Sequence, residues 1–90
     1  MLRISMTSEL DGTTVTIEGR VVGPWVDELH ACWRRLLSST SGPICVQLDG
    51  VTFIDDVGKA VLRAMHIDGA ILTANTVMMR AVIDAIVGHR

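Results

Sequence analysis

The acidic pair Asp55-Asp56, together with His66, is the group of side chains whose types suit a divalent metal ion. Carboxylates and imidazole are common metal ligands in proteins. However, Asp56 and His66 lie in one segment with helical spacing of its apolar residues, and ten residues of helix span about 15 Å. The two side chains are therefore too far apart to share an ion. We expect no metal site and no cofactor.

Nucleophilic and nucleotide-dependent chemistry each need a motif that this sequence lacks. It contains no G-x-S-x-G, G-x-x-x-x-G-K-S/T, G-x-G-x-x-G or H-E-x-x-H. The histidines His30, His66 and His89 fall in separate segments. Cys32 and Cys45 fall in a predicted helix and a predicted strand of the core, where thiols are inert. We therefore expect a protein that is not an enzyme.

The composition narrows the class of partner. The chain has 90 residues, of which 49% are hydrophobic, and a net charge of −2. That length suits a single domain, residues 1–90. Its largest basic cluster is the pair Arg34-Arg35, whereas nucleic-acid binding requires a basic surface. No apolar run reaches the 18 residues of a membrane span, and the N-terminus lacks a signal-peptide pattern. We expect a cytoplasmic protein that binds no nucleic acid and does not insert into a membrane.

The start of the chain has the period-two pattern of two β-strands, at residues 2–8 and 13–19. The dipeptide Asp11-Gly12 between them is typical of a tight turn, so we expect an antiparallel hairpin. In the first strand Leu2, Ile4, Met6 and Ser8 are expected on one face, and in the second strand Val15 and Ile17 are expected to point inward.

The remainder of the chain alternates between helical and strand patterns. We expect helices at 25–38, 56–68 and 76–87, with Pro24 at the first helical position of the first and Asn75 as N-cap of the third, and buried strands at 44–48 and 70–74, with 50–55 as a connecting segment. The inward stripes expected on these helices are Val26, Leu29, Trp33, Leu36 and Leu37; then Val57, Val61, Leu62 and Met65; then Met78 or Met79 with Val82, Ile83 and Ile86. The order ββαβαβα predicts an α/β fold, in which the antiparallel hairpin and the later parallel strands form one mixed sheet.

Residues 46–62 read Val-Gln-Leu-Asp-Gly-Val-Thr-Phe-Ile-Asp-Asp-Val-Gly-Lys-Ala-Val-Leu. This segment resembles the STAS domain, the family of bacterial anti-sigma factor antagonists and of the cytoplasmic tails of sulfate transporters. That family has an apolar strand, an aspartate, a short turn, Phe-apolar-Asp-Ser-Ser/Thr-Gly and then an amphipathic helix. The match is gapless from Leu48 to Gly58, and the order of elements agrees over the whole chain. The resemblance implies a STAS-like fold and a non-catalytic role in binding another protein.

One position departs from the family pattern. In the antagonists the residue before the glycine is the Ser or Thr that a partner kinase phosphorylates, and here it is Val57. Val57 has no hydroxyl, so the phosphorylation switch does not transfer to this chain. Asp56 stands where Ser is common, and either mimics a phosphate at the start of the helix or caps that helix. The same two interpretations apply to Asp55.

The resemblance places the partner-binding loop at Asp55, Asp56, Val57 and Gly58. Lys59, Arg63 and His66 follow at i, i+4 and i+7 and predict an exposed stripe beside the loop. That stripe is either part of the partner surface or an ordinary solvated face. Trp33 is expected in the core, whereas Trp25 is either buried or partly exposed at an interface.

Three functions fit this pattern. The first is a regulator resembling an anti-sigma factor antagonist, which binds an anti-sigma protein or switch kinase through residues 55–66. The alternative is an accessory subunit that binds the ATPase of an ABC-type lipid transporter, a role that needs no phospho-acceptor. The third is a ligand-binding or scaffold role in a larger regulatory complex. The sequence does not indicate an oligomeric state.

Overall fold

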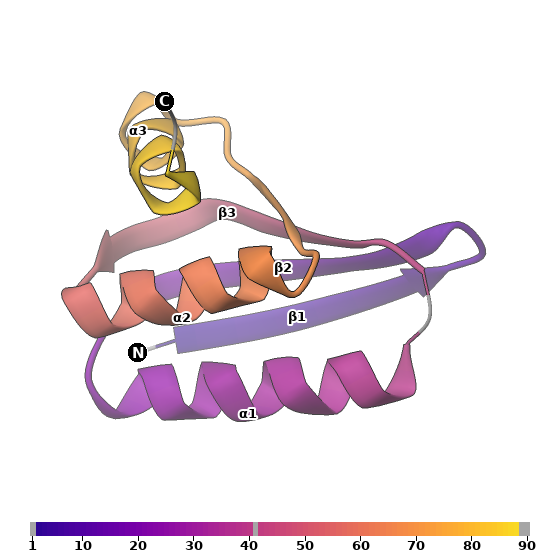
Figure 1. Cartoon of the computed structure of the whole chain (residues 1–90). Coiled ribbons are helices and arrows are strands. Elements are labelled where there is room, and N and C mark those ends of the chain that lie inside the picture. Colours follow the sequence, from indigo (N-terminus) through magenta and orange to yellow (C-terminus); the bar gives the residue numbers. More distant parts are fainter. Residues whose placement is uncertain (1, 41, 89–90) are drawn as a thin grey trace.

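The computed structural model describes residues 2–40 and 42–88, and its elements follow the predicted order ββαβαβα (Figure 1). The strands are β1 (Leu2–Glu9), β2 (Gly12–Val21), β3 (Ile44–Ile54) and β4 (Ile71–Thr73), and the helices are α1 (Pro24–Ser39), α2 (Asp56–Ile67) and α3 (Val77–Val87).

The four strands form one mixed sheet in the order β1-β2-β3-β4. Strand β1 pairs antiparallel with β2, as the hairpin pattern predicted. The β2–β3 and β3–β4 pairs are parallel, as expected when helices connect successive strands. The predicted α/β fold with a mixed sheet is therefore confirmed. Because β2 and β3 are parallel, the loops that follow them, β2–α1 and β3–α2, lie at the same end of the sheet.

The core lies between the sheet and the helices. Alternate residues of the central strands are buried, among them Val15 and Ile17 of β2 and Val46 and Leu48 of β3. The intervening residues, such as Thr16 and Gln47, are only half-buried. The helices therefore cover one face of the sheet. On that face α2 contacts both α1 and α3 and lies between them (Figure 1).

Strand β3 is longer than the sequence predicted. Residues 50–55 were expected to form a connection, but β3 continues to Ile54, with Gly50 paired with Glu18 and Ile54 with Val21. Two register shifts interrupt this pairing, between Thr16 and Glu18 and between Gly19 and Arg20. Such irregularities break the alternation of side chains along a strand, which is why the period-two pattern was not visible here.

The hairpin turn also differs from the prediction. The last pair is Glu9 with Gly12, so the turn consists of Leu10 and Asp11 and not of Asp11-Gly12. Met6 and Ser8 lie on one face with Leu2 and Ile4, as expected, because they pair with Val15 and Thr13 of the buried face of β2, but both are exposed. Met6 borders an open cleft, and the tip of the hairpin extends beyond the helices (Figure 1).

The third helix begins one residue later than predicted. Its N-cap is Thr76, whose Oγ1 accepts a hydrogen bond from the Met79 N–H at 3.2 Å. Asn75, the predicted cap, instead donates from its backbone N–H and its side-chain amide to the carboxylate of Asp49. This pairing ties the start of α3 to the middle of β3. Of the two methionines considered for the inner stripe, Met79 is buried and Met78 is exposed.

Four helix and strand positions are more exposed than the sequence predicted. Leu37 and Val57 are exposed although the periodicity placed them inward. Both lie at the margin of an apolar stripe, where the spacing alone does not decide the side. Cys32 and Cys45 are free and half-buried, not fully buried. Cys45 is on the sheet face that the helices leave uncovered, and Cys32 borders the cleft beside Met6.

Candidate functional site

The loop between β3 and α2 is organised by the carboxylate of Asp55. Asp55 has the extended backbone of an N-cap residue, and its Oδ1 accepts a hydrogen bond from the Gly58 N–H at 2.7 Å. This bond satisfies one of the N–H groups that the first turn of a helix leaves without a partner. Asp55 is therefore the cap of α2. Of the two interpretations of Asp56, the cap is not made, because Asp56 is already the first helical residue.

The same carboxylate joins two loops. Oδ2 of Asp55 accepts a hydrogen bond from the Gly23 N–H at 3.1 Å, in the loop between β2 and α1. The backbone N–H of Asp55 in turn donates to the Val21 carbonyl at 3.2 Å. The hydrogen bonds from Gly58 and Gly23 stabilise the ionised form and lower the pKa of Asp55 below its ordinary value. Asp55 is therefore negatively charged at neutral pH, and its carboxylate is occupied by hydrogen bonds within the two loops.

Gly58 is required by the close approach of α2 to β2. A Cβ atom at this position would lie 2.6 Å from the Val21 carbonyl oxygen and 2.9 Å from both Ile54 Cγ2 and Val21 Cγ1. Real Cβ atoms do not approach backbone that closely, so any larger residue would push α2 away from the sheet. The glycine of the motif therefore fixes how near the start of α2 lies to the ends of β2 and β3.

Asp56 and Val57 point away from this anchored backbone. Asp56 is exposed, and the Val57 side chain is 58% exposed. Val57 occupies the position where the resemblance places a phosphorylated hydroxyl. Because its side chain is exposed, this position is accessible to a partner, although it carries no phosphate acceptor. The result is an exposed apolar side chain next to an exposed carboxylate in the first turn of α2.

The predicted stripe along α2 is only partly a surface. Lys59 and Arg63 are exposed, and with Asp56 they line a shallow cleft of about 280 Å³ between α2 and Ala85 and Ile86 of α3. His66 is half-buried, and its Nδ1 is buried without a hydrogen-bond partner among the described residues. The prediction that His66 is exposed was wrong. Helix α2 lies between two other helices, so a side chain directed toward either neighbour becomes partly covered.

Two exposed aromatic side chains lie at the same end of the sheet as the start of α2. Phe53 is 50% exposed at the end of β3, and the Arg20 guanidinium lies 5.6 Å from the centre of its ring. Trp25, in the first turn of α1, is 37% exposed, which agrees with the partly exposed alternative. Sequence reasoning did not assign Phe53 to the site. Thr52 and Phe53 are both exposed between the buried residues Val51 and Ile54, so the strand does not alternate here and its periodicity gave no signal for Phe53.

We call this region the Asp55 surface, defined by Arg20, Trp25, Phe53, Asp56, Val57, Lys59 and Arg63. Its members come from the ends of β2 and β3, the first turn of α1 and the exposed side of α2, and the Asp55 carboxylate holds the β2–α1 loop to the start of α2. It combines exposed apolar side chains with charges of both signs, the mixture found at protein interfaces. Within residues 2–40 and 42–88, no group of three or more His, Cys, Asp and Glu side chains is arranged to hold a metal ion.

Over the same residues, no helix is both long enough and apolar enough to cross a membrane.

Comparison with known proteins identifies the fold. No protein-family model and no curated protein matches the sequence. Among solved structures, the chain is similar to an anti-sigma factor antagonist from Mycobacterium paratuberculosis, with a TM-score of 0.83 and 15% identity over 98% of this chain and 79% of the antagonist. A further similar structure is Mglu, with a TM-score of 0.61 and 18% identity over 80% of this chain and 19% of Mglu. The chain therefore has the STAS-like fold that its motif predicted.

Proposed function

We propose that this protein is a regulatory, non-catalytic binding module that docks another protein through the Asp55 surface. The observation that carries the proposal is the position of Val57. It is exposed in the first turn of α2, on a loop that the Asp55 carboxylate fixes from within. A loop held in one conformation loses little entropy on binding, which favours recognition by a partner.

The chemistry of the surface indicates what kind of ligand it suits. Trp25 and Phe53 provide aromatic contact area, and aromatic residues are enriched among those that dominate binding energy. Lys59 and Arg63 add positive charge along the exposed side of α2. A partner surface with an apolar centre and acidic margin complements this arrangement. The fold shared with the antagonist from M. paratuberculosis supports an anti-sigma protein or a switch kinase as the partner.

In our proposal, binding of the partner is not controlled by phosphorylation, unlike in the antagonists of the family. Phosphorylation of an antagonist introduces about two negative charges at the position of Val57. Val57 cannot accept a phosphate, so binding is constitutive at this position. Asp56 supplies a single fixed charge one residue earlier, where the partial positive charge at the start of α2 favours an anion.

A second candidate partner is the ATPase of an ABC-type lipid transporter. The lack of a hydroxyl at Val57 favours this candidate, because an accessory subunit of a transporter needs no phospho-acceptor. The two proposals share the surface and differ in the partner.

Partner capture from a lysate of the native host separates these proposals. The wild-type chain and an Asp56→Lys variant are used as bait, and the retained proteins are identified by mass spectrometry. Recovery of an anti-sigma protein or switch kinase that Asp56→Lys fails to retain supports the first proposal. Recovery of a transporter ATPase supports the second. A partner retained equally by both baits argues against the Asp55 surface.

A further inference from the structure

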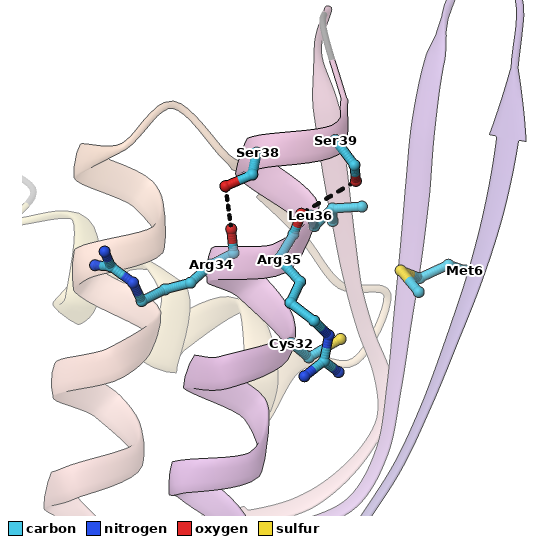
Figure 2. A pocket seen from close by; sticks show the side chains of 7 residues that line it. All are labelled: Met6, Cys32, Arg34, Arg35, Leu36, Ser38 and Ser39. Atoms are coloured by element: carbon cyan, nitrogen blue, oxygen red, sulfur yellow. Dashed lines mark hydrogen bonds between the residues drawn. The ribbon is translucent and has the colours of Figure 1, made fainter.

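A second open surface lies at the opposite end of α1 from the Asp55 loop. A cleft of about 690 Å³ separates strand β1 from the C-terminal half of α1. Its apolar lining includes Met6 of β1 and Cys32 and Leu36 of α1 (Figure 2). Met6 is 53% exposed there. We call this region the α1–β1 cleft.

The charged side chains that line the α1–β1 cleft are all cationic. They are Arg34 and Arg35, and among the residues that the structure describes no acidic one lines it. The Arg35 guanidinium lies beside Cys32, whereas the Arg34 guanidinium points to the other side of α1 (Figure 2). The hydroxyls of Ser38 and Ser39 donate to the carbonyls of Arg34 and Arg35, so they are engaged within the helix. Arg35 is therefore the charged group that an occupant meets, and the cleft suits an apolar group next to a carboxylate.

The tip of the β1–β2 hairpin has the complementary chemistry. Leu10 is fully exposed, at 109% of its reference surface, and its sequence neighbours Glu9 and Asp11 are exposed carboxylates. The tip extends beyond the helices as a protrusion (Figure 1). An isolated exposed leucine is ordinary in itself. Here, however, Leu10 lies between two carboxylates, and the α1–β1 cleft of the same chain offers apolar side chains beside an arginine. The tip of one copy is therefore complementary in charge and polarity to the cleft of another. A second copy of this chain is the occupant that these charges favour.

The geometry permits a closed pair. Met6 in the cleft and Leu10 at the tip are four residues apart on one strand edge, a separation of about 13 Å. A two-fold axis between these positions would bring the tip of each copy to the cleft of the other, and such a self-complementary contact closes as a dimer.

We propose that two copies associate by reciprocal insertion of the hairpin tip into the α1–β1 cleft. Leu10 of each copy contacts Met6, Cys32 and Leu36 of the other, and Glu9 or Asp11 pairs with Arg35. The contact is small, so the dimer forms at high protein concentration. It leaves the Asp55 surface of both copies free and presents two of them on one particle.

Sedimentation equilibrium of the full chain from micromolar to millimolar concentration tests this proposal. We expect a monomer–dimer equilibrium in which Leu10→Ser raises the dissociation constant roughly tenfold or more, since two leucines leave the interface. Thermal unfolding of the dilute variant should match that of the wild type, because Leu10 is fully exposed in the monomer. A chain that stays monomeric at millimolar concentration, or a dimer unaffected by Leu10→Ser, overturns the proposal.

Charge reversal tests the pairing and its symmetry. Arg35→Glu should weaken the dimer, whereas Arg34→Glu, the same change on a side chain pointing elsewhere, should weaken it less. A chain with both Glu9→Lys and Asp11→Lys should also fail to self-associate, but should form a heterodimer when mixed with the Arg35→Glu chain. Failure of this mixture to pair, or assemblies larger than a dimer, would overturn the reciprocal arrangement.

Discussion

Asp55 and Gly23, 32 residues apart in the sequence, are joined by a hydrogen bond of 3.1 Å from the Gly23 N–H to the Asp55 carboxylate. The other oxygen of that carboxylate accepts from the Gly58 N–H at 2.7 Å. One side chain therefore sets both the start of α2 and the position of the loop that precedes α1. The aspartate of the motif is explained by this structural role before any partner is considered.

The Asp55 contacts predict an acid-sensitive component of stability. The native pKa of Asp55 lies below its unfolded value, so between the two pKa values the unfolded state binds a proton that the native state does not. The stabilisation is therefore complete at neutral pH and is lost as the pH falls through the native pKa. Asp55→Asn, whose amide has one acceptor oxygen, should lower the free energy of unfolding at pH 7 and flatten its decline below about pH 4.

Urea unfolding of both proteins between neutral pH and pH 3 measures this effect. Asp56→Asn is the matched control, because the same change on the adjacent exposed carboxylate leaves the cap intact. Curves for Asp55→Asn and wild type that run parallel over the acid range would contradict the account.

Gly58→Ala should destabilise the fold by about 1–3 kcal/mol, as overpacking does elsewhere. The added methyl would meet the Val21 carbonyl, which is backbone and cannot move alone. Gly50→Ala is the control, since its Cβ would meet side-chain atoms only, Glu18 Cγ at 2.7 Å and Glu18 Cβ at 3.1 Å, and the exposed Glu18 side chain can change its rotamer. Chemical denaturation should show a clearly smaller loss for Gly50→Ala. Equal losses for the two variants would mean that the approach of α2 to Val21 is not the cause.

A hydrogen bond ties the end of α2 to α1. The indole Nε1 of Trp33 donates to the Asp68 carboxylate at 2.9 Å, and Trp33 is itself buried. A double-mutant cycle with Trp33→Phe and Asp68→Ala should give a coupling energy of about 0.5–1.5 kcal/mol. Additive losses would indicate that the bond contributes nothing beyond the packing of the indole.

The sequence predicted the order of the elements because hydrophobic periodicity is strong in β2, α1 and α2. It also predicted the loop between β3 and α2, through the motif ending at Gly58, and this loop belongs to the binding surface that we propose. It did not distinguish Asp55 from Asp56 as the cap, since both residues suit that position chemically. The backbone decides: Asp55 is extended and Asp56 is already helical.

Other differences depend on contacts between distant segments. The continuation of β3 past Gly50 relies on pairing with β2 across two register shifts, which residues 50–55 do not reveal by themselves. The partial burial of His66 depends on the helices on either side of α2. The exposure of Phe53 follows from the same irregular pairing. Each of these three features is determined by contacts with segments distant in the sequence, and the local hydrophobic periodicity carries no information about those contacts.

The measurement that tests the central claim most directly is the affinity of the captured partner for Val57→Asp compared with Val77→Asp. Both valines are exposed in the first turn of a helix, so the substitution is equally tolerated by the two helices. Val77 lies at the far end of α3 from Ala85 and Ile86, the α3 residues that line the cleft beside the Asp55 surface. We expect Val57→Asp to weaken binding at least about tenfold, the loss of roughly 1.4 kcal/mol. Val77→Asp should bind like the wild type, as measured by isothermal titration calorimetry. Equal affinity of wild type and Val57→Asp would contradict a binding role for the Asp55 surface.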